Sequence, residues 1–230
     1  MRIAILSDIH EDYRSLKKVF KKINRKGCDL NVCLGDISGF SNTFYRYRKT
    51  RNASACLDLI RENCEIIVPG NHDLHAAGKI PDQPAVEGHE YWPHEEDLDP
   101  GYDKQELAYL ADLPEYVILP AVDYNILLSH YAEPNISGLY KGFYSSGKEF
   151  EAHFQLMNKL QCKLGFTGHV HARGFHLVYP QQFRQNGYSR LQLKEFPVVI
   201  GIPPVTHHKY RTGFCIFDTT SCLLQVIKHY

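Results

Sequence analysis

The feature that most constrains the fold of this 230-residue chain is a series of short apolar runs, each of which ends in residues that can bind metal. The runs occupy residues 2–7, 30–34, 65–68, 124–129 and 162–167. They are followed by Asp8 and His10, Asp36, Asn71, His130, and His169 with His171. Runs of this length, bounded by turn residues, predict buried β-strands. In an α/β sheet, ligands bind at the carboxyl ends of the strands, so these seven residues are expected to converge on one crevice.

The segments between the runs predict helices. Over residues 13–26, Asp12 is placed to cap the start, Gly27 to end the helix, and apolar residues recur at helical spacing at Leu16, Val19, Phe20 and Ile23. Further helices are expected at about 53–63, 103–112 and 147–161. From residue 174 the pattern changes to short alternating runs, which predict an antiparallel β segment over 174–179, 188–193, 197–202, 213–218 and 222–228. The predicted fold class is therefore α/β.

The length fits one large domain over residues 1–230, and the 43% of hydrophobic residues is enough for a sizeable core. The longest interval between motifs is rich in Pro, Gly and acidic residues. Its first part, residues 74–101, is predicted to be an irregular insertion that lies over the site, because loops of this length are often functional.

The overall charge argues against a large polyanionic partner. The net charge is zero and the pI is about 7.2, so no global field recruits nucleic acid or an anionic membrane. One local run, 44–51, interleaves aromatic and basic residues. It keeps a phosphate or nucleic-acid contact open, although such runs are more often solvated edges of loops or helices.

The cysteines and the amino terminus favour a cytoplasmic protein. None of the seven cysteines forms a CxxC pair and most lie in apolar runs, so reduced thiols are expected. Met1 leads directly into the first run, which does not resemble a signal peptide, and no apolar stretch is long enough to span a bilayer. The oligomeric state is left open by the sequence.

The residues at the strand ends form a particular ligand set. Two Asp, one Asn and four His suit Mn, Fe, Zn or Ni better than Ca or Mg, which prefer oxygen ligands alone. Seven ligands are too many for one tetrahedral ion and suit two ions that share a bridge. Taken singly, Asp8 and Asp36 also fit as helix caps or turn residues, and His130 as a buried core histidine.

The motifs together resemble those of a known family. Asp8-x-His10, Gly35-Asp36, Gly70-Asn71-His72-Asp73, His130 and Gly168-His169-x-His171 are similar, in this order, to the motifs of the calcineurin-like metallophosphoesterase superfamily, and most of all to its small bacterial and archaeal phosphodiesterases. The resemblance implies a four-layer α/β/β/α sandwich, in which two mixed β-sheets are flanked by helices. The β-rich end of the chain suits this architecture.

The resemblance also implies a role for each residue of the site. Asp8, His10 and His171 would hold a first divalent metal ion, Asn71, His130 and His169 a second, and Asp36 would bridge the two. A hydroxide between the ions would attack the phosphorus of a small phosphate ester, a phosphodiester or a nucleotide. His72 would protonate the leaving group and Asp73 would orient His72. Mn is the expected metal, with Fe, Ni or Zn as alternatives.

Two other functions remain open at this level. A nuclease relative is favoured by the 44–51 run and disfavoured by the neutral net charge. A non-catalytic scaffold, as in the retromer subunit of the same superfamily, is disfavoured because His72 and every expected ligand are retained. The chain departs from the family pattern at Glu11, Asp12 and Tyr131, which follow the first and fourth motifs. The adjacent pair His207 and His208 matches no motif and is the best candidate for an additional lining of the cleft.

Overall fold

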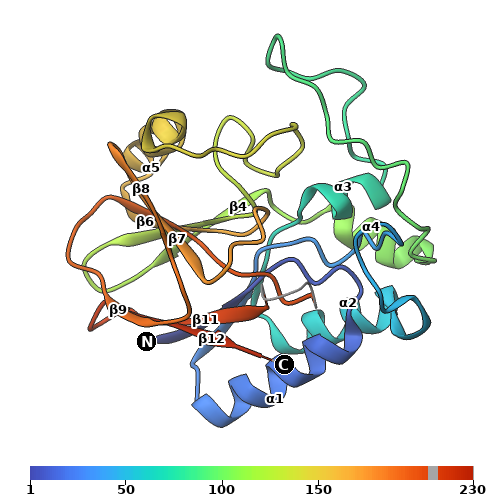
Figure 1. Cartoon of the computed structure of the whole chain (residues 1–230), viewed down its shortest axis with the longest axis horizontal. Coiled ribbons are helices and arrows are strands. Elements are labelled where there is room, and N and C mark those ends of the chain that lie inside the picture. The colour runs from blue at the N-terminus through green and yellow to red at the C-terminus, as the bar shows by residue number, and fades with distance from the viewer. Residues whose placement is uncertain (207–211, 230) are drawn as a thin grey trace.

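The computed structural model describes residues 1–206 and 212–229, so His207 and His208 lie outside the described residues. Within these ranges the chain forms two six-stranded sheets (Figure 1). The first has the strand order β3 (Ile66–Ile67), β2 (Leu30–Cys33), β1 (Arg2–Leu6), β11 (Gly213–Asp218), β12 (Leu223–Lys228), β9 (Arg190–Gln192). The second has the order β4 (Tyr116–Pro120), β5 (Asn125–Ser129), β6 (Cys162–Thr167), β10 (Val198–Gly201), β7 (Phe175–Tyr179), β8 (Gln182–Asn186).

The helices cover the outer faces of the two sheets. They are α1 (Tyr13–Lys26), α2 (Ala53–Asn63), α3 (Asn71–Ala76), α4 (Lys104–Ala111) and α5 (Glu151–Lys159), with short 3₁₀ turns at η1 (Arg48–Thr50) and η2 (Gly147–Phe150). In the described part of the chain, no helix has the length and apolar character needed to cross a membrane. All seven cysteines lie in the described ranges and are free thiols.

Alternation along the strands builds four layers. In β1, Ile3 and Ile5 face the second sheet and share a buried core with Ile126 and Leu128 of that sheet. The intervening β1 residues, Ala4 and Leu6, instead pack against the buried faces of α1 and α2. On the other side of the molecule, Leu127 and Val199 pack against Met157 of α5. Because successive residues of a strand point to opposite faces of the sheet, they belong to different hydrophobic cores. The predicted α/β/β/α sandwich is confirmed.

Local chemistry explains why α1 has the predicted bounds. The Asp12 carboxylate accepts a hydrogen bond from the Ser15 backbone N–H at 3.0 Å, and Gly27 adopts φ +60° at the carboxyl end. Its apolar residues, among them Leu16, Val19 and Phe20, form one buried stripe, while the basic residues lie on the solvent face.

Four elements differ from the sequence prediction. The edge strands β4 and β8 were not predicted, because β4 ends in a proline and exposes every second residue, and β8 is largely polar. Helix α3 occupies the first residues of the predicted irregular stretch, since its start lies inside the Gly70–Asp73 motif. The carboxyl-terminal strands are mostly antiparallel as predicted, but β10 pairs with β6 in parallel.

The pairing of parallel strands positions the site. In the first sheet β1, β2 and β3 are parallel neighbours, and in the second β5 and β6 are parallel neighbours. Their carboxyl ends therefore lie side by side, as they must if the residues that follow them are to meet. The loop between α3 and α4 extends away from the body of the molecule and then returns past these strand ends (Figure 1).

Candidate metal centre and active site

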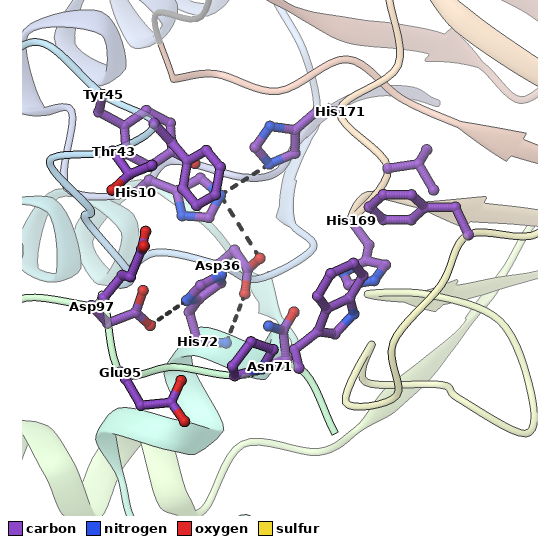
Figure 2. A pocket seen from close by; sticks show the side chains of 16 residues that line it. His10, Asp36, Thr43, Tyr45, Asn71, His72, Glu95, Asp97, His169 and His171 are labelled. Carbon is purple, nitrogen blue, oxygen red and sulfur yellow. Dashed lines mark hydrogen bonds and ion pairs between the residues drawn. The ribbon is translucent and has the colours of Figure 1, made fainter. Parts of the chain in front are cut away.

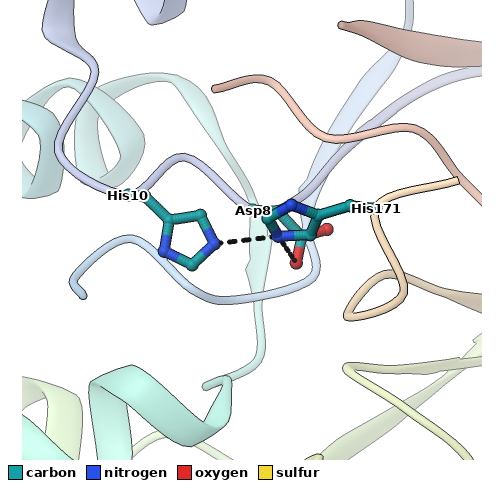
Figure 3. A group of neighbouring side chains, drawn as sticks. All are labelled: Asp8, His10 and His171. Atoms are coloured by element: carbon teal, nitrogen blue, oxygen red, sulfur yellow. Dashed lines mark hydrogen bonds and ion pairs between the residues drawn. The ribbon is translucent and has the colours of Figure 1, made fainter. Parts of the chain in front are cut away.

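The predicted ligands gather into two groups, and each group takes residues from both sheets. Ligand atoms of Asp8, His10 and His171 lie within 4.8 Å of one another (Figure 3). A second group with the same spacing consists of Asp36, His130 and His169. Asn71 lines the same cleft as Asp36 and His169 (Figure 2). The structure therefore brings together all seven residues that the sequence indicated.

Sharp bends in the backbone turn these side chains inward. Five of the seven have positive φ, namely Asp8 (56°), His10 (46°), Asp36 (52°), His169 (64°) and His171 (47°). The left-handed region costs a non-glycine residue about 1–3 kcal/mol, and such residues cluster at functional sites. The space around them is also tight: a Cβ on Gly168 would lie 2.8 Å from Asp8 Oδ2. The conformation of these loops therefore places the side chains in the cluster at a cost in local backbone stability.

The imidazole rings are oriented by backbone carbonyls. His10 Nδ1 donates to the Gly39 carbonyl at 3.0 Å, and His130 Nδ1 donates to the Leu34 carbonyl at 2.6 Å. The Nε2 atom of each ring therefore faces the cluster, where His10 Nε2 lies 3.0 Å from His171 Nε2 and His130 Nε2 lies 3.2 Å from Asp36 Oδ2. A carbonyl on one ring nitrogen fixes the tautomer and leaves a lone pair on the other, as metal-binding histidines require.

The chemistry of the donors fits cations. Among the described residues, Asp8 Oδ2, Asn71 Oδ1 and His169 Nε2 are buried without a hydrogen-bond partner. Buried polar atoms are normally paired, so three such atoms that offer lone pairs to one cluster without a hydrogen-bond partner fit a cation as their partner. Burial lowers the pKa of His10 and of His169 to about 3, which keeps both lone pairs free at neutral pH.

Asp36 has the charge and the position that a ligand shared by two cations would need. Burial alone would raise the pKa of its carboxyl, but His130 and His72 beside it hold that pKa well below the usual value. Asp36 Oδ2 also lies 3.8 Å from His10 Nε2, so this carboxylate faces ligands of both groups. The seven residues thus offer an anionic centre flanked by two sets of neutral and anionic donors, which fits two divalent cations.

His72 is held beside the cluster by a carboxylate that the sequence did not indicate. Its Nδ1 pairs with Asp97 Oδ2 at 2.6 Å, and a ring nitrogen of His72 lies within 4.8 Å of ligand atoms of His10 and Asp36 (Figure 2). Since Asp97 engages Nδ1, Nε2 is the nitrogen available toward the cluster. Burial opposes protonation of His72, but Asp36 and Asp97 outweigh it and raise its pKa to about 9.

The predicted role of Asp73 is corrected by this geometry. Its carboxylate accepts hydrogen bonds from the backbone N–H groups of Ser38 (2.9 Å), Gly70 (3.0 Å) and Ile37 (3.3 Å). Asp73 therefore ties the loop after β2 to the start of α3, and Asp97 is the residue that orients the His72 ring. Asp97 was missed because it lies 25 residues farther along the chain, in a loop without a motif.

The ligand cluster lies at the base of a cleft of about 520 Å³. Aromatic side chains line much of it, namely Phe44, Tyr45, Trp92 and Phe143. Glu95, Glu96 and Asp97 add acidic groups, and no lysine or arginine is among the described lining residues. Two basic residues of the 44–51 run are engaged elsewhere: Arg46 donates to the Asn42 carbonyl at 2.6 Å, and Arg51 pairs with Glu11 at 3.1 Å.

The fold and the site together define a metal-dependent phosphoesterase of the sandwich type. A family model described as calcineurin-like phosphoesterase matches residues 1–173. The chain belongs to this family, and the resemblance stated from the motifs is confirmed.

Several proteins are similar to this chain. It is 38% identical over 78 residues to the protein of Methanocaldococcus jannaschii named Uncharacterized protein MJ0912, and the matched segment is 34% of this chain and 28% of that protein. Among solved structures, a metallophosphoesterase from Sphaerobacter thermophilus has a TM-score of 0.71 at 21% identity, covering 100% of this chain and 88% of its own. Another solved structure, that of a novel archaeal phosphodiesterase, has a TM-score of 0.53 at 14% identity, covering 99% of each chain. These likenesses show the fold.

Proposed function

We propose that the protein hydrolyses small phosphodiesters at a dinuclear metal centre. The observation that carries this proposal is the pair of ligand groups joined at Asp36, with His72 beside them (Figure 2). One cation would be held by Asp8, His10 and His171, and the other by Asn71, His130 and His169, with Asp36 between them. When bound, such ions activate water at neutral pH and neutralise the charge of a phosphate ester. Mn²⁺ is the expected metal in this mixed nitrogen and oxygen site.

The protein's own residues account for the rest of the reaction. The phosphate lies at the base of the cleft, where the ligand cluster is, and the alcohol that leaves is directed toward His72. Since its Nδ1 is held by Asp97, His72 has Nε2 free to give a proton to the departing oxygen. Asp97 stays ionised and stabilises the imidazolium form of His72.

The lining of the cleft favours diesters over monoesters. A phosphodiester carries one negative charge and a monoester up to two near neutral pH. Glu95 and Glu96 are in the lining, and no lysine or arginine among the described lining residues compensates the second charge. The exposed aromatic side chains Phe44 and Phe143 instead offer apolar surface to the organic groups of a diester.

The test compares bis-p-nitrophenyl phosphate with p-nitrophenyl phosphate. The protein is stripped with a chelator, its metal content is measured by elemental analysis, and Mn²⁺, Fe²⁺, Ni²⁺ or Zn²⁺ is then restored. We expect close to two ions per chain and metal-dependent turnover, with the higher kcat/KM on the diester. A protein that binds no metal and hydrolyses neither ester would contradict the proposal.

A further inference from the structure

One oxygen of Asp97 accepts hydrogen bonds from two imidazoles. His72 Nδ1 lies 2.6 Å from Asp97 Oδ2, and His94 Nδ1 lies 3.1 Å from the same atom. The second histidine lies outside the cleft lining and is 7% exposed, so it does not line the proposed position of a substrate. A buried histidine that pairs with the partner of the proton donor calls for a functional explanation.

The ring of His94 is fixed by the helix that carries His72. It stacks on His75 with ring centroids 4.4 Å apart and an interplanar angle of 13°, and it meets the His72 ring edge-on at 4.9 Å. His72 and His75 are three residues apart on α3 and therefore share one face of the helix. His94 thus packs against that face, and this contact holds the 92–97 segment beside α3.

Asp97 needs such support because its own backbone is irregular. The 92–97 segment contains no helix or strand, apart from the isolated bridge between Ser41 and Asp97. A carboxylate on a loop samples several rotamers. In each rotamer that turns the carboxylate away from His72 Nδ1, the hydrogen bond that orients the imidazole is lost. A second donor on the same oxygen restricts the carboxylate to the rotamer that faces His72.

Resting on the phosphodiesterase function proposed above, we propose that His94 is a positioning residue for proton transfer. It holds Asp97 in place, Asp97 holds His72 Nδ1, and His72 Nε2 is thereby aimed at the departing oxygen. In the reaction, the oxygen of water forms a new bond to phosphorus while the bond from phosphorus to the leaving alcohol breaks. The His72 Nε2 proton passes to the leaving oxygen, and a proton from the consumed water restores His72. Asp97 gives up and takes up no proton in these steps.

The dependence on the leaving group separates this role from a structural one. A substrate with a good leaving group needs little protonation, whereas one with a poor leaving group needs it in the transition state. The substrates are therefore methyl p-nitrophenyl phosphate and methyl phenyl phosphate, which differ in the acidity of the phenol released. The readout is the ratio of kcat for the two esters, with KM, metal content and thermal unfolding measured in parallel.

Two substitutions at His94 and one control carry the experiment. His94→Phe fills the volume without a donor, and we expect it to lower kcat on the phenyl ester at least tenfold and on the p-nitrophenyl ester less than threefold. His94→Asn places an amide nitrogen where Nδ1 lies and should recover most of the phenyl-ester rate, which also covers the case in which the Phe variant fails to fold. His89→Phe, at an exposed histidine of the same loop, should leave the ratio unchanged.

The outcomes distinguish this inference from the proposed function. Equal losses on both esters in His94→Phe, no loss on the phenyl ester in that variant, or a His94→Asn variant that loses the phenyl-ester rate selectively would overturn the role of His94 and leave the phosphodiesterase proposal standing. A wild-type protein that binds metal but hydrolyses neither ester would overturn the phosphodiesterase proposal, and the role of His94 with it.

Discussion

The backbone N–H of His72 donates to Asp36 Oδ1 at 3.1 Å, so the proposed bridging ligand also fixes the first turn of the helix that carries the proposed proton donor. The other carboxylate oxygen, Oδ2, faces His130 at 3.2 Å. Metal binding and the placement of His72 therefore depend on one side chain.

We expect Asp36→Asn to keep the hydrogen bond to His72 and to lose the negative charge between the cations. Without that charge the two ions repel each other, so the metal content should fall to one ion or fewer per chain and kcat by about 10³-fold or more. Elemental analysis and bis-p-nitrophenyl phosphate turnover check this. Asp58→Asn, at an exposed position of α2, is the matched control. Two tightly bound ions in Asp36→Asn would contradict the bridging role.

His72→Ala should keep both metal ions and lose proton transfer. General acid catalysis is worth about 10²–10⁴-fold, so we expect a loss of that size on methyl phenyl phosphate and a much smaller one on methyl p-nitrophenyl phosphate. Asp97→Asn should change the ratio of the two rates in the same direction. If His72→Ala hydrolyses both esters at wild-type rates, His72 is not the proton donor.

Asp73→Ala should act on stability. It removes the acceptor of three buried backbone N–H groups, those of Ile37, Ser38 and Gly70. Leaving buried donors unpaired costs about 1–3 kcal/mol each, so we expect the free energy of unfolding to fall by about 3 kcal/mol or more. Urea unfolding of the metal-free protein measures this, with Asp58→Ala as the control. A loss below about 1 kcal/mol would mean that these donors find other partners.

Stability should fall in mild acid because of His153. Burial lowers its pKa from 6.5 to about 4, so between these values the unfolded chain binds a proton that the folded chain does not. The contribution of His153 is unchanged above pH 6.5, and stability declines by about 1.4 kcal/mol per pH unit as the pH falls toward 4. His153→Gln should show a correspondingly shallower decline in urea unfolding between pH 6.5 and 4, and His89→Gln should match the wild type. Identical slopes for all three proteins would contradict a neutral, buried His153.

Reversing the charge of the cleft should change substrate preference. Glu95→Lys with Glu96→Lys places two cations in the lining, so we expect kcat/KM for p-nitrophenyl phosphate to rise at least threefold relative to the diester. The gain should shrink in 0.5 M salt, because screening weakens exposed charges. Asp82→Lys with Glu87→Lys makes the same change outside the cleft and should leave the ratio unchanged. A ratio that does not move would show that these charges do not reach the substrate.

The sequence predicts those structural features that are specified by residues close together in the chain. The bounds of α1 follow from Asp12, Gly27 and one apolar stripe, and the seven candidate ligands follow from their places in the turns after buried strands. The strands β4 and β8 lack that signal, because an edge strand needs few buried residues on either face.

The support of His72 could not be predicted in the same way. Asp73 is adjacent to His72 in the chain, but on a helix neighbouring residues point in different directions, and its carboxylate turns to the loop after β2. Asp97 and His94 reach His72 only because a long loop returns to α3. Nothing in the local pattern of residues 77–103 specifies that return, which depends on tertiary contacts.

Each ligand group draws from both sheets, and this gives bound ions a mechanical role. Asp8 and His10 follow a strand of the first sheet, whereas His171 follows a strand of the second; Asp36 and His130 are divided in the same way. Two ions held in this manner would cross-link the sandwich at one end, so that neither sheet slides on the other without disturbing both coordination shells. Chelation should therefore speed amide hydrogen exchange at the carboxyl ends of β1, β2, β5 and β6 while the opposite end of the sandwich keeps its protection.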